Sequence, residues 1–223
     1  RGSDSANWGN SEQIVKDMRK YVKAIGEDKL LLSEHGDGKM LTDYTLDSKW
    51  NFDFFYPMGE WMGEEKPLNL LEKQLFEAVV RMPRSLANAS YNFIANHDFA
   101  RALYKADGNV NNVMAAQILM MTYVGSPCIF YGDETGMEGI PNPGVPGANE
   151  PGAAPTSFSS MNWDKNTWNK DIYGLQKSLG NLRKDYAKVF HDGVYKSLLM
   201  DLKNNIFSFA RWNDGGKVVS IVS

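Results

Sequence analysis

The chain lacks the cysteines, the long apolar runs and the excess of positive charge that mark disulfide-rich, membrane-spanning and nucleic-acid-binding proteins. Its 223 residues include a single cysteine, Cys128, which excludes an internal disulfide and a cysteine-based metal cluster. No apolar run approaches the ~20 residues that a membrane-spanning helix needs. The formal net charge of −3 supplies no basic field for a nucleic acid or an anionic membrane surface. These absences predict an ordinary globular protein that has neither nucleic acid nor membrane as a partner.

Cys128 itself lies in an apolar run, residues 127–131. A free cysteine in such a run behaves as a small apolar side chain, so we expect it to be buried rather than to act as a reactive thiol.

Aromatic residues are the one class in excess, at 12% of the chain. Sugar rings stack on aromatic faces, so the excess suits a carbohydrate-binding protein. Filling of the hydrophobic core explains most of these side chains equally well. Composition alone therefore leaves both interpretations open.

Helical and strand patterns alternate along most of the chain. Apolar residues recur at helical spacing over residues 11–25, 67–82, 109–123 and 169–186. Short apolar runs typical of buried strands occupy residues 30–32, 50–56, 91–95 and 127–131. Four strand–helix units predict a parallel sheet, and they amount to half of an eight-stranded barrel.

The pattern changes after the fourth strand. Residues 139–157 are rich in proline and glycine and predict a long loop. Beyond the last helix, residues 193–199, 205–211 and 217–222 read as strands, and residues 213–216 (NDGG) predict a hairpin turn between the last two. We expect an antiparallel sheet here.

Acidic side chains follow two of the predicted parallel strands. Glu34 comes after the first strand and Asp98 after the third. Each means little alone, because acids are common in loops, but both should lie on one face of a barrel, where such folds carry their chemistry. Glycoside hydrolysis needs such a pair, since one carboxylic acid protonates the leaving oxygen and a carboxylate attacks the anomeric carbon.

Four segments strengthen this interpretation. Residues 93–98 (FIANHD) resemble the seventh-strand signature of the α-amylase family, and residues 125–134 (GSPCIFYGDE) are similar to its eighth-strand motif. Residues 30–34 (LLLSE) resemble the fifth-strand motif, and residues 160–163 (SMNW) fall where the family often has Met-x-Trp. The resemblance covers nearly the whole chain.

The resemblance implies an α/β fold, namely the second half (strands 5–8) of a TIM (β/α)8 barrel followed by the start of an antiparallel β-domain. The barrel part would span residues 1–190 and the β-domain residues 191–223. Strands 5–8 alone leave two sheet edges unpaired. We therefore expect the chain to pair with the missing N-terminal half of the barrel or to self-associate.

The resemblance also implies roles for individual residues. Glu34 is the expected general acid/base, Asp98 stabilises the transition state, and His97 hydrogen-bonds the sugar. Asp4 takes the position of the family's nucleophile. An N-terminal aspartate without a role is the alternative, because two residues separate Arg1 from Asp4 where the family has one, and residues 1–3 also resemble an expression-vector scar.

Other residues are secondary candidates for substrate binding. Asn96 belongs to the same motif as His97. Arg101 either contacts sugar or pairs with an acid of a neighbouring loop. Trp8 lies where family members often place a group that touches the leaving-group sugar, although a hydrophobic staple for the first helix explains it as well. Asp133 and Glu134 are expected to hold the loop after the eighth-strand motif.

The implied activity is retaining hydrolysis of α-glucosidic bonds in starch-type glucans or malto-oligosaccharides. A transglycosylase or α-glucoside isomerase would use the same residues. A non-catalytic relative, which binds glycans or accompanies a transporter, would not need both Glu34 and Asp98. The resemblance assigns no cofactor to these residues. Calcium is an option only for a full-length protein, since the family's usual calcium site draws on the half of the barrel absent here.

Overall fold

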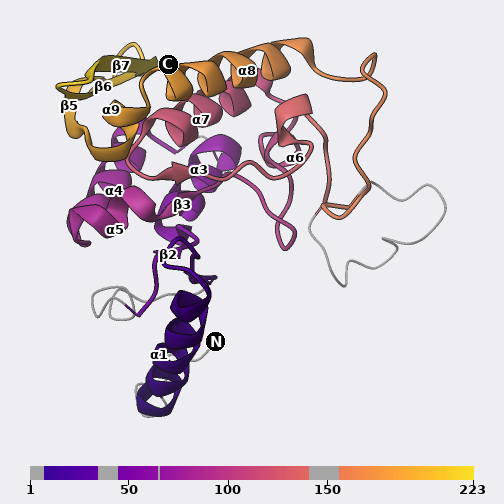
Figure 1. Cartoon of the computed structure of the whole chain (residues 1–223). Coiled ribbons are helices and arrows are strands. Elements are labelled where there is room, and N and C mark those ends of the chain that lie inside the picture. The colour runs from indigo at the N-terminus through magenta and orange to yellow at the C-terminus, as the bar shows by residue number, and fades with distance from the viewer. Residues whose placement is uncertain (1–7, 35–44, 65, 141–155) are drawn as a thin grey trace.

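The computed structural model describes residues 8–34, 45–64, 66–140 and 156–223 (Figure 1). The first part of the chain forms short strands between helices: α1 (Trp8–Ile25), β1 (Leu32–Ser33), β2 (Ser48–Lys49), α3 (Phe52–Glu64), α4 (Leu68–Val80), α5 (Arg84–Ala89), β3 (Tyr91–Asn92), α6 (Ala102–Lys105), α7 (Val110–Thr122), β4 (Ser126–Pro127) and the 3-10 turn η1 (Asp133–Thr135). The last part comprises α8 (Lys170–Asp185), α9 (Ala187–Asp192), β5 (Val194–Asp201), β6 (Ile206–Asn213) and β7 (Gly216–Val222). None of the described helices is long and apolar enough to cross a membrane.

The short strands are parallel, as the alternating pattern predicts. β1 pairs with β2, and β3 pairs with β4. An isolated parallel bridge between Trp50 and Tyr91 joins the two pairs. The strands therefore follow one another in chain order, and the residues after each strand lie at the same edge of the sheet. This edge is where the sequence predicts the candidate acids.

One predicted strand is wrong. Residues 50–56 are extended in the prediction, but all except the first two belong to the helix α3. The buried side chains Phe54, Met58, Trp61 and Met62 recur at helical spacing along α3. Pro57, which is predicted to stop a strand, lies inside the helix, where it removes only one backbone hydrogen bond. The strand of this unit is β2, just before the aromatic run.

The helices enclose a core centred on α7. Its residues are buried on nearly every side (Val113, Ala115, Ala116, Gln117, Leu119, Met120, Met121 and Thr122). α7 packs against α3, α8 and β7, so it lies between the helical layer and the C-terminal sheet. Asn109 caps α7 and Asn169 caps α8, each accepting backbone N–H groups of the first turn. Both helices therefore begin within a residue of the predicted position.

The C-terminal strands form the expected antiparallel sheet in the order β5-β6-β7, with Asn213 opposite Gly216 at the hairpin turn. Arg211 ties this sheet to the helices. Its fully buried guanidinium donates to the carbonyl oxygens of Tyr123 (2.9 Å), Phe190 (3.3 Å) and Gly193 (3.2 Å). Burial lowers the pKa of Arg211 to about 10.

One apolar row and one strand edge are not covered within the described part of the chain. α1 projects from the body of the molecule (Figure 1), and one row of its side chains, Ile14, Met18, Tyr21 and Ile25, is exposed. Cys128 is half-buried, so its predicted burial is only partial. It lies beside the outer strand β4, whose far edge has no partner among the described residues.

Candidate active site

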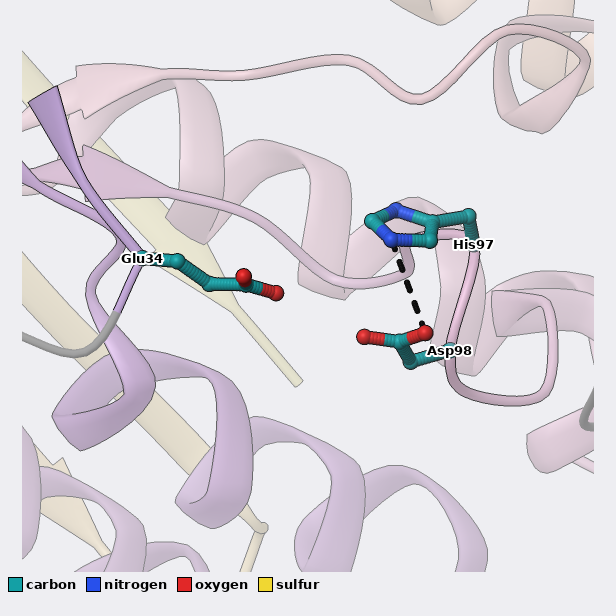
Figure 2. A group of neighbouring side chains, drawn as sticks. All are labelled: Glu34, His97 and Asp98. Atoms are coloured by element: carbon teal, nitrogen blue, oxygen red, sulfur yellow. Dashed lines mark ion pairs between the residues drawn. The ribbon is translucent and has the colours of Figure 1, made fainter. Parts of the chain in front are cut away.

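The structure brings Glu34, His97 and Asp98 together. Glu34 directly follows β1, and the other two follow the segment that continues from β3. One carboxylate oxygen or ring nitrogen from each residue lies within 4.8 Å of those from the other two. Figure 2 shows the carboxylates of Glu34 and Asp98 pointing toward each other from these two elements. The parallel strand order explains this meeting, because Glu34 and Asp98, 64 positions apart, follow strands of the same sheet.

His97 and Asp98 also form an ion pair, with 3.5 Å between the His97 Nε2 and Asp98 Oδ1 atoms (Figure 2). Both side chains are nearly half exposed, and Glu34 is exposed. The three groups offer a carboxyl that can donate a proton, a second carboxylate and an imidazole. A carboxyl that donates a proton is one of the two groups that hydrolysis of a glycosidic bond requires.

Asn96 shapes the backbone that carries these two residues. Its side chain is buried, and its Oδ1 atom accepts the N–H groups of Asp98 (2.9 Å) and Phe99 (3.2 Å). Such a turn is typical of asparagine and fixes the direction of the following residue. The sugar contact predicted for Asn96 does not agree with this burial. Asn96 positions Asp98 instead.

Arg101 has no exposed surface. Its guanidinium donates to the carbonyl oxygens of Tyr131 (2.6 Å) and Ser157 (3.0 Å), pairs with Asp133 at 3.3 Å, and lies 4.5 Å from the ring centroid of Phe130. The structure therefore supports pairing with a loop acid, the second of the two predicted roles. The predicted sugar contact does not agree with complete burial.

Asp133 and Glu134 hold the loop after β4, as predicted. Glu134 accepts the backbone N–H of Gly132 at 2.7 Å. Burial raises the pKa of Asp133 to about 7, although the nearby Arg101 opposes this rise. Arg101 and Asp133 together join the segment that follows Asp98 to two loops, at residues 131–133 and at residue 157.

Three residues that the sequence did not single out surround His97. Ser157 donates from its hydroxyl to the carbonyl oxygen of His97 at 2.8 Å. The ring of Phe158 stacks on the imidazole, with centroids 5.9 Å apart and planes at 22°. Trp50 meets the imidazole edge-on at 6.1 Å. No local signal marks these positions, because they approach His97 only through the tertiary fold.

Two of the predicted site residues cannot be compared with this geometry. Asp4 lies outside the described residues. Trp8 begins α1, but its side chain is also outside the described part. Their predicted roles, the nucleophile and a substrate contact, stay predictions.

Comparison with known proteins gives concordant relatives. Over 220 residues the chain is 26% identical to a cyclomaltodextrinase from Bacillus sp, a match that covers 96% of this chain and 36% of the relative. It is 31% identical over 136 residues to neopullulanase 2 from Thermoactinomyces vulgaris, covering 57% of this chain and 22% of that protein. The chain thus spans roughly a third or less of the length of these curated relatives.

Solved structures show the same fold. A cyclomaltodextrinase structure superposes with a TM-score of 0.81 at 23% identity, covering 95% of this chain and 34% of its own. The cyclic alpha-maltosyl-(1→6)-maltose hydrolase from Arthrobacter globiformis also gives 0.81, at 19% identity, covering 94% and 45%. The family model for the alpha amylase catalytic domain matches residues 3–189, most of the chain. The chain therefore belongs to the alpha-amylase family.

Proposed function

We propose that this chain is part of a retaining glycoside hydrolase that cleaves α-glucosidic bonds in starch-type glucans or malto-oligosaccharides. The observation that carries the proposal is the meeting of Glu34, His97 and Asp98 at one edge of the parallel sheet. Family membership and the names of the relatives, cyclomaltodextrinase and neopullulanase, agree with this substrate class.

In the proposed reaction, Glu34 protonates the glycosidic oxygen while the carboxylate at the Asp4 position attacks the anomeric carbon. Asp98 accepts hydrogen bonds from sugar hydroxyls most strongly in the transition state, and His97 donates another. Water then attacks the covalent intermediate, and Glu34 removes its proton. The His97 Nε2 and Asp98 Oδ1 atoms lie 3.5 Å apart, close enough for both side chains to bond the same sugar.

We further propose that the chain supplies strands 5–8 of a (β/α)8 barrel, through residues 1–190, and the start of a β-domain, through residues 191–223. The relatives' greater length supports this proposal. So do the exposed apolar side chains of Leu30, Leu32 and Ile129, which lie in or next to the outer strands β1 and β4. In a closed barrel, the other half would cover these surfaces and pair both edges.

The test is Glu34→Gln in the full-length protein, assayed on starch and on maltohexaose. The substitution keeps the shape of the side chain but removes the proton donor. We expect the rate to fall by about 10²–10⁴-fold. Glu27→Gln, at an exposed position after α1, is the matched control and should leave the rate unchanged. An unchanged rate for Glu34→Gln would exclude Glu34 as the acid.

A further inference from the structure

Phe158 occupies an unusual position for a phenylalanine. One side of its ring stacks on His97, within the candidate active site, yet 49% of the side chain stays exposed. It belongs neither to a helix nor to a strand, and the residue before it, Ser157, is completely buried. The ring is therefore held at the surface beside the acidic group rather than in the core.

The backbone around this ring is fixed on both sides. Ser157 donates from its backbone N–H to the carbonyl oxygen of Ile140 (2.9 Å) and from its hydroxyl to that of His97 (2.8 Å). Its carbonyl oxygen accepts from Arg101 at 3.0 Å. On the other side, the Tyr131 hydroxyl donates to the carbonyl oxygen of Ser159 at 2.9 Å. Residues 157–159 cannot move away without breaking several hydrogen bonds. The segment therefore loses little conformational entropy when a ligand binds.

We propose that Phe158 is a substrate-binding residue, whose exposed ring face stacks on a glucose ring of the α-glucan next to Glu34, His97 and Asp98. A pyranose ring carries its hydroxyls mainly around its rim and presents C–H groups on its faces. A flat aromatic ring matches such a face, and covering both removes apolar surface from water. The position also suits this role, because a sugar bonded to His97 would lie within reach of the ring that packs on His97.

The alternative for the same contact is a positioning role, in which Phe158 only orients the imidazole. The two roles differ in what they predict. A residue that touches sugar changes substrate affinity and KM, and conserving an aromatic ring preserves its effect. A residue that acts only through His97 weakens the hydrogen bond that His97 makes to sugar in the transition state, so it lowers kcat more than it changes affinity or KM.

The inference rests on the proposed function, so the experiment measures hydrolysis and binding separately. In the full-length protein, Phe158→Ala and Phe158→Trp are assayed on maltohexaose for kcat and KM. The same substitutions in the Glu34→Gln background are titrated with maltohexaose by calorimetry. Phe76→Ala serves as the matched control, because Phe76 is similarly exposed (45%) but lies on α4.

We expect Phe158→Ala to raise KM and weaken maltohexaose binding by about two- to tenfold, the range given by single aromatic contacts. Phe158→Trp should restore both, and Phe76→Ala should change neither. Hydrolysis by the wild type with unchanged KM and binding in Phe158→Ala would overturn the inference and leave the proposed function standing. A fall in kcat alone would overturn it in favour of the positioning role.

If the protein is not a hydrolase, the same measurements on the wild type give a different result. A wild-type protein that binds maltohexaose without hydrolysing it, and loses affinity in Phe158→Ala, would support the stacking role and reject hydrolysis. A wild-type protein that neither binds nor hydrolyses maltohexaose would overturn both.

Discussion

Arg101 and Asp133 form an ion pair at 3.3 Å in which neither side chain is more than 4% exposed. The pair connects the segment after Asp98 to the loop after β4. Arg101 also binds the carbonyl oxygen of Ser157, whose hydroxyl reaches His97. A buried arginine thus joins the segment after Asp98, the loop after β4 and Ser157, which itself contacts His97.

Replacing Arg101 with methionine should destabilise the protein by about 3–5 kcal/mol, because it leaves a buried carboxyl and two carbonyl oxygens without their donor. The free energy of unfolding, measured by urea denaturation, checks this. Arg81→Ala breaks the exposed pair of Arg81 with Glu77 on α4 and should cost about 1 kcal/mol or less. Equal losses for the two variants would mean that the buried pair holds nothing in place.

The contribution of Asp133 to folding stability should decrease as the pH rises, which is the opposite of what most acidic residues do. Burial raises its folded-state pKa to about 7, above its ordinary value of 3.8, so the folded state holds this proton more tightly than the unfolded state. The stability that Asp133 contributes is therefore fully present below about pH 4 and is lost as the pH rises to about 7. Most carboxylates act in the opposite direction.

Asp133→Asn removes this titration. Relative to the wild type, the variant should become more stable by on the order of a few kcal/mol as the pH rises from 4 to 7. Urea denaturation of both proteins at several pH values measures the difference. A gap between them that stays constant over this range would show that Asp133 titrates normally.

Sequence patterns predicted most of the longer helices and most of the strands. α4, α7 and α8 begin close to their predicted residues, because their apolar spacing is a local signal, whereas the short helices α5, α6 and α9 were not predicted. Residues 52–56 misled the prediction, since a run of aromatic residues is typical of both a buried strand and a buried helix. Only packing on the helices around α3 decides between the two. β2 was missed because its residues, Ser48 and Lys49, carry no apolar signal.

The candidate site shows the same division. Glu34, His97 and Asp98 lie in motifs that can be recognised in the sequence, and the parallel strand order brings them together. The burial of Asn96 and Arg101 could not be predicted, because both follow the strand as polar residues, and exposure depends on loops far away in the chain. Phe158 could not be found at all, since its contact with His97 joins residues 61 positions apart.

Two glycines differ in whether their backbone and surroundings admit a side chain, so replacing each with alanine tests backbone strain. Gly125 has a φ of +129°, and a Cβ atom there would lie 2.5 Å from the side chain of Asn92. Asn92 cannot give way, because its amide is buried between Asn51 and Val124. Gly125→Ala should therefore cost about 1–3 kcal/mol.

Gly174 lies inside α8, and a Cβ atom added there would meet no other part of the molecule within 4 Å. Gly174→Ala should stabilise the protein by about 0.5–1 kcal/mol, because alanine loses less conformational entropy in a helix. Relative to the wild type, the midpoint temperature of thermal unfolding should fall for Gly125→Ala and rise for Gly174→Ala. A stable Gly125→Ala protein would mean that Asn92 does not pack against Gly125 in this way.

The proposed second half of the barrel would cover surfaces that are exposed in this chain. Tyr21 is 74% exposed and Ile25 is 77% exposed, on the same row of α1, and among the described residues β1 and β4 each pair on one side only. An exposed apolar row and two open sheet edges favour association. We therefore expect the isolated chain to sediment as an oligomer, or to bind an apolar dye as a monomer.

Replacing Tyr21 and Ile25 with serine should reduce either effect, and adding the N-terminal half of the full-length protein should suppress both. The matched control, serine at the exposed Phe76, should change little, because Phe76 lies on α4, whose main contacts are with α3, α5 and β6 rather than with β1 or β4. A dye-free monomer of 25.1 kDa would contradict the proposal, since half a barrel cannot cover its own apolar face.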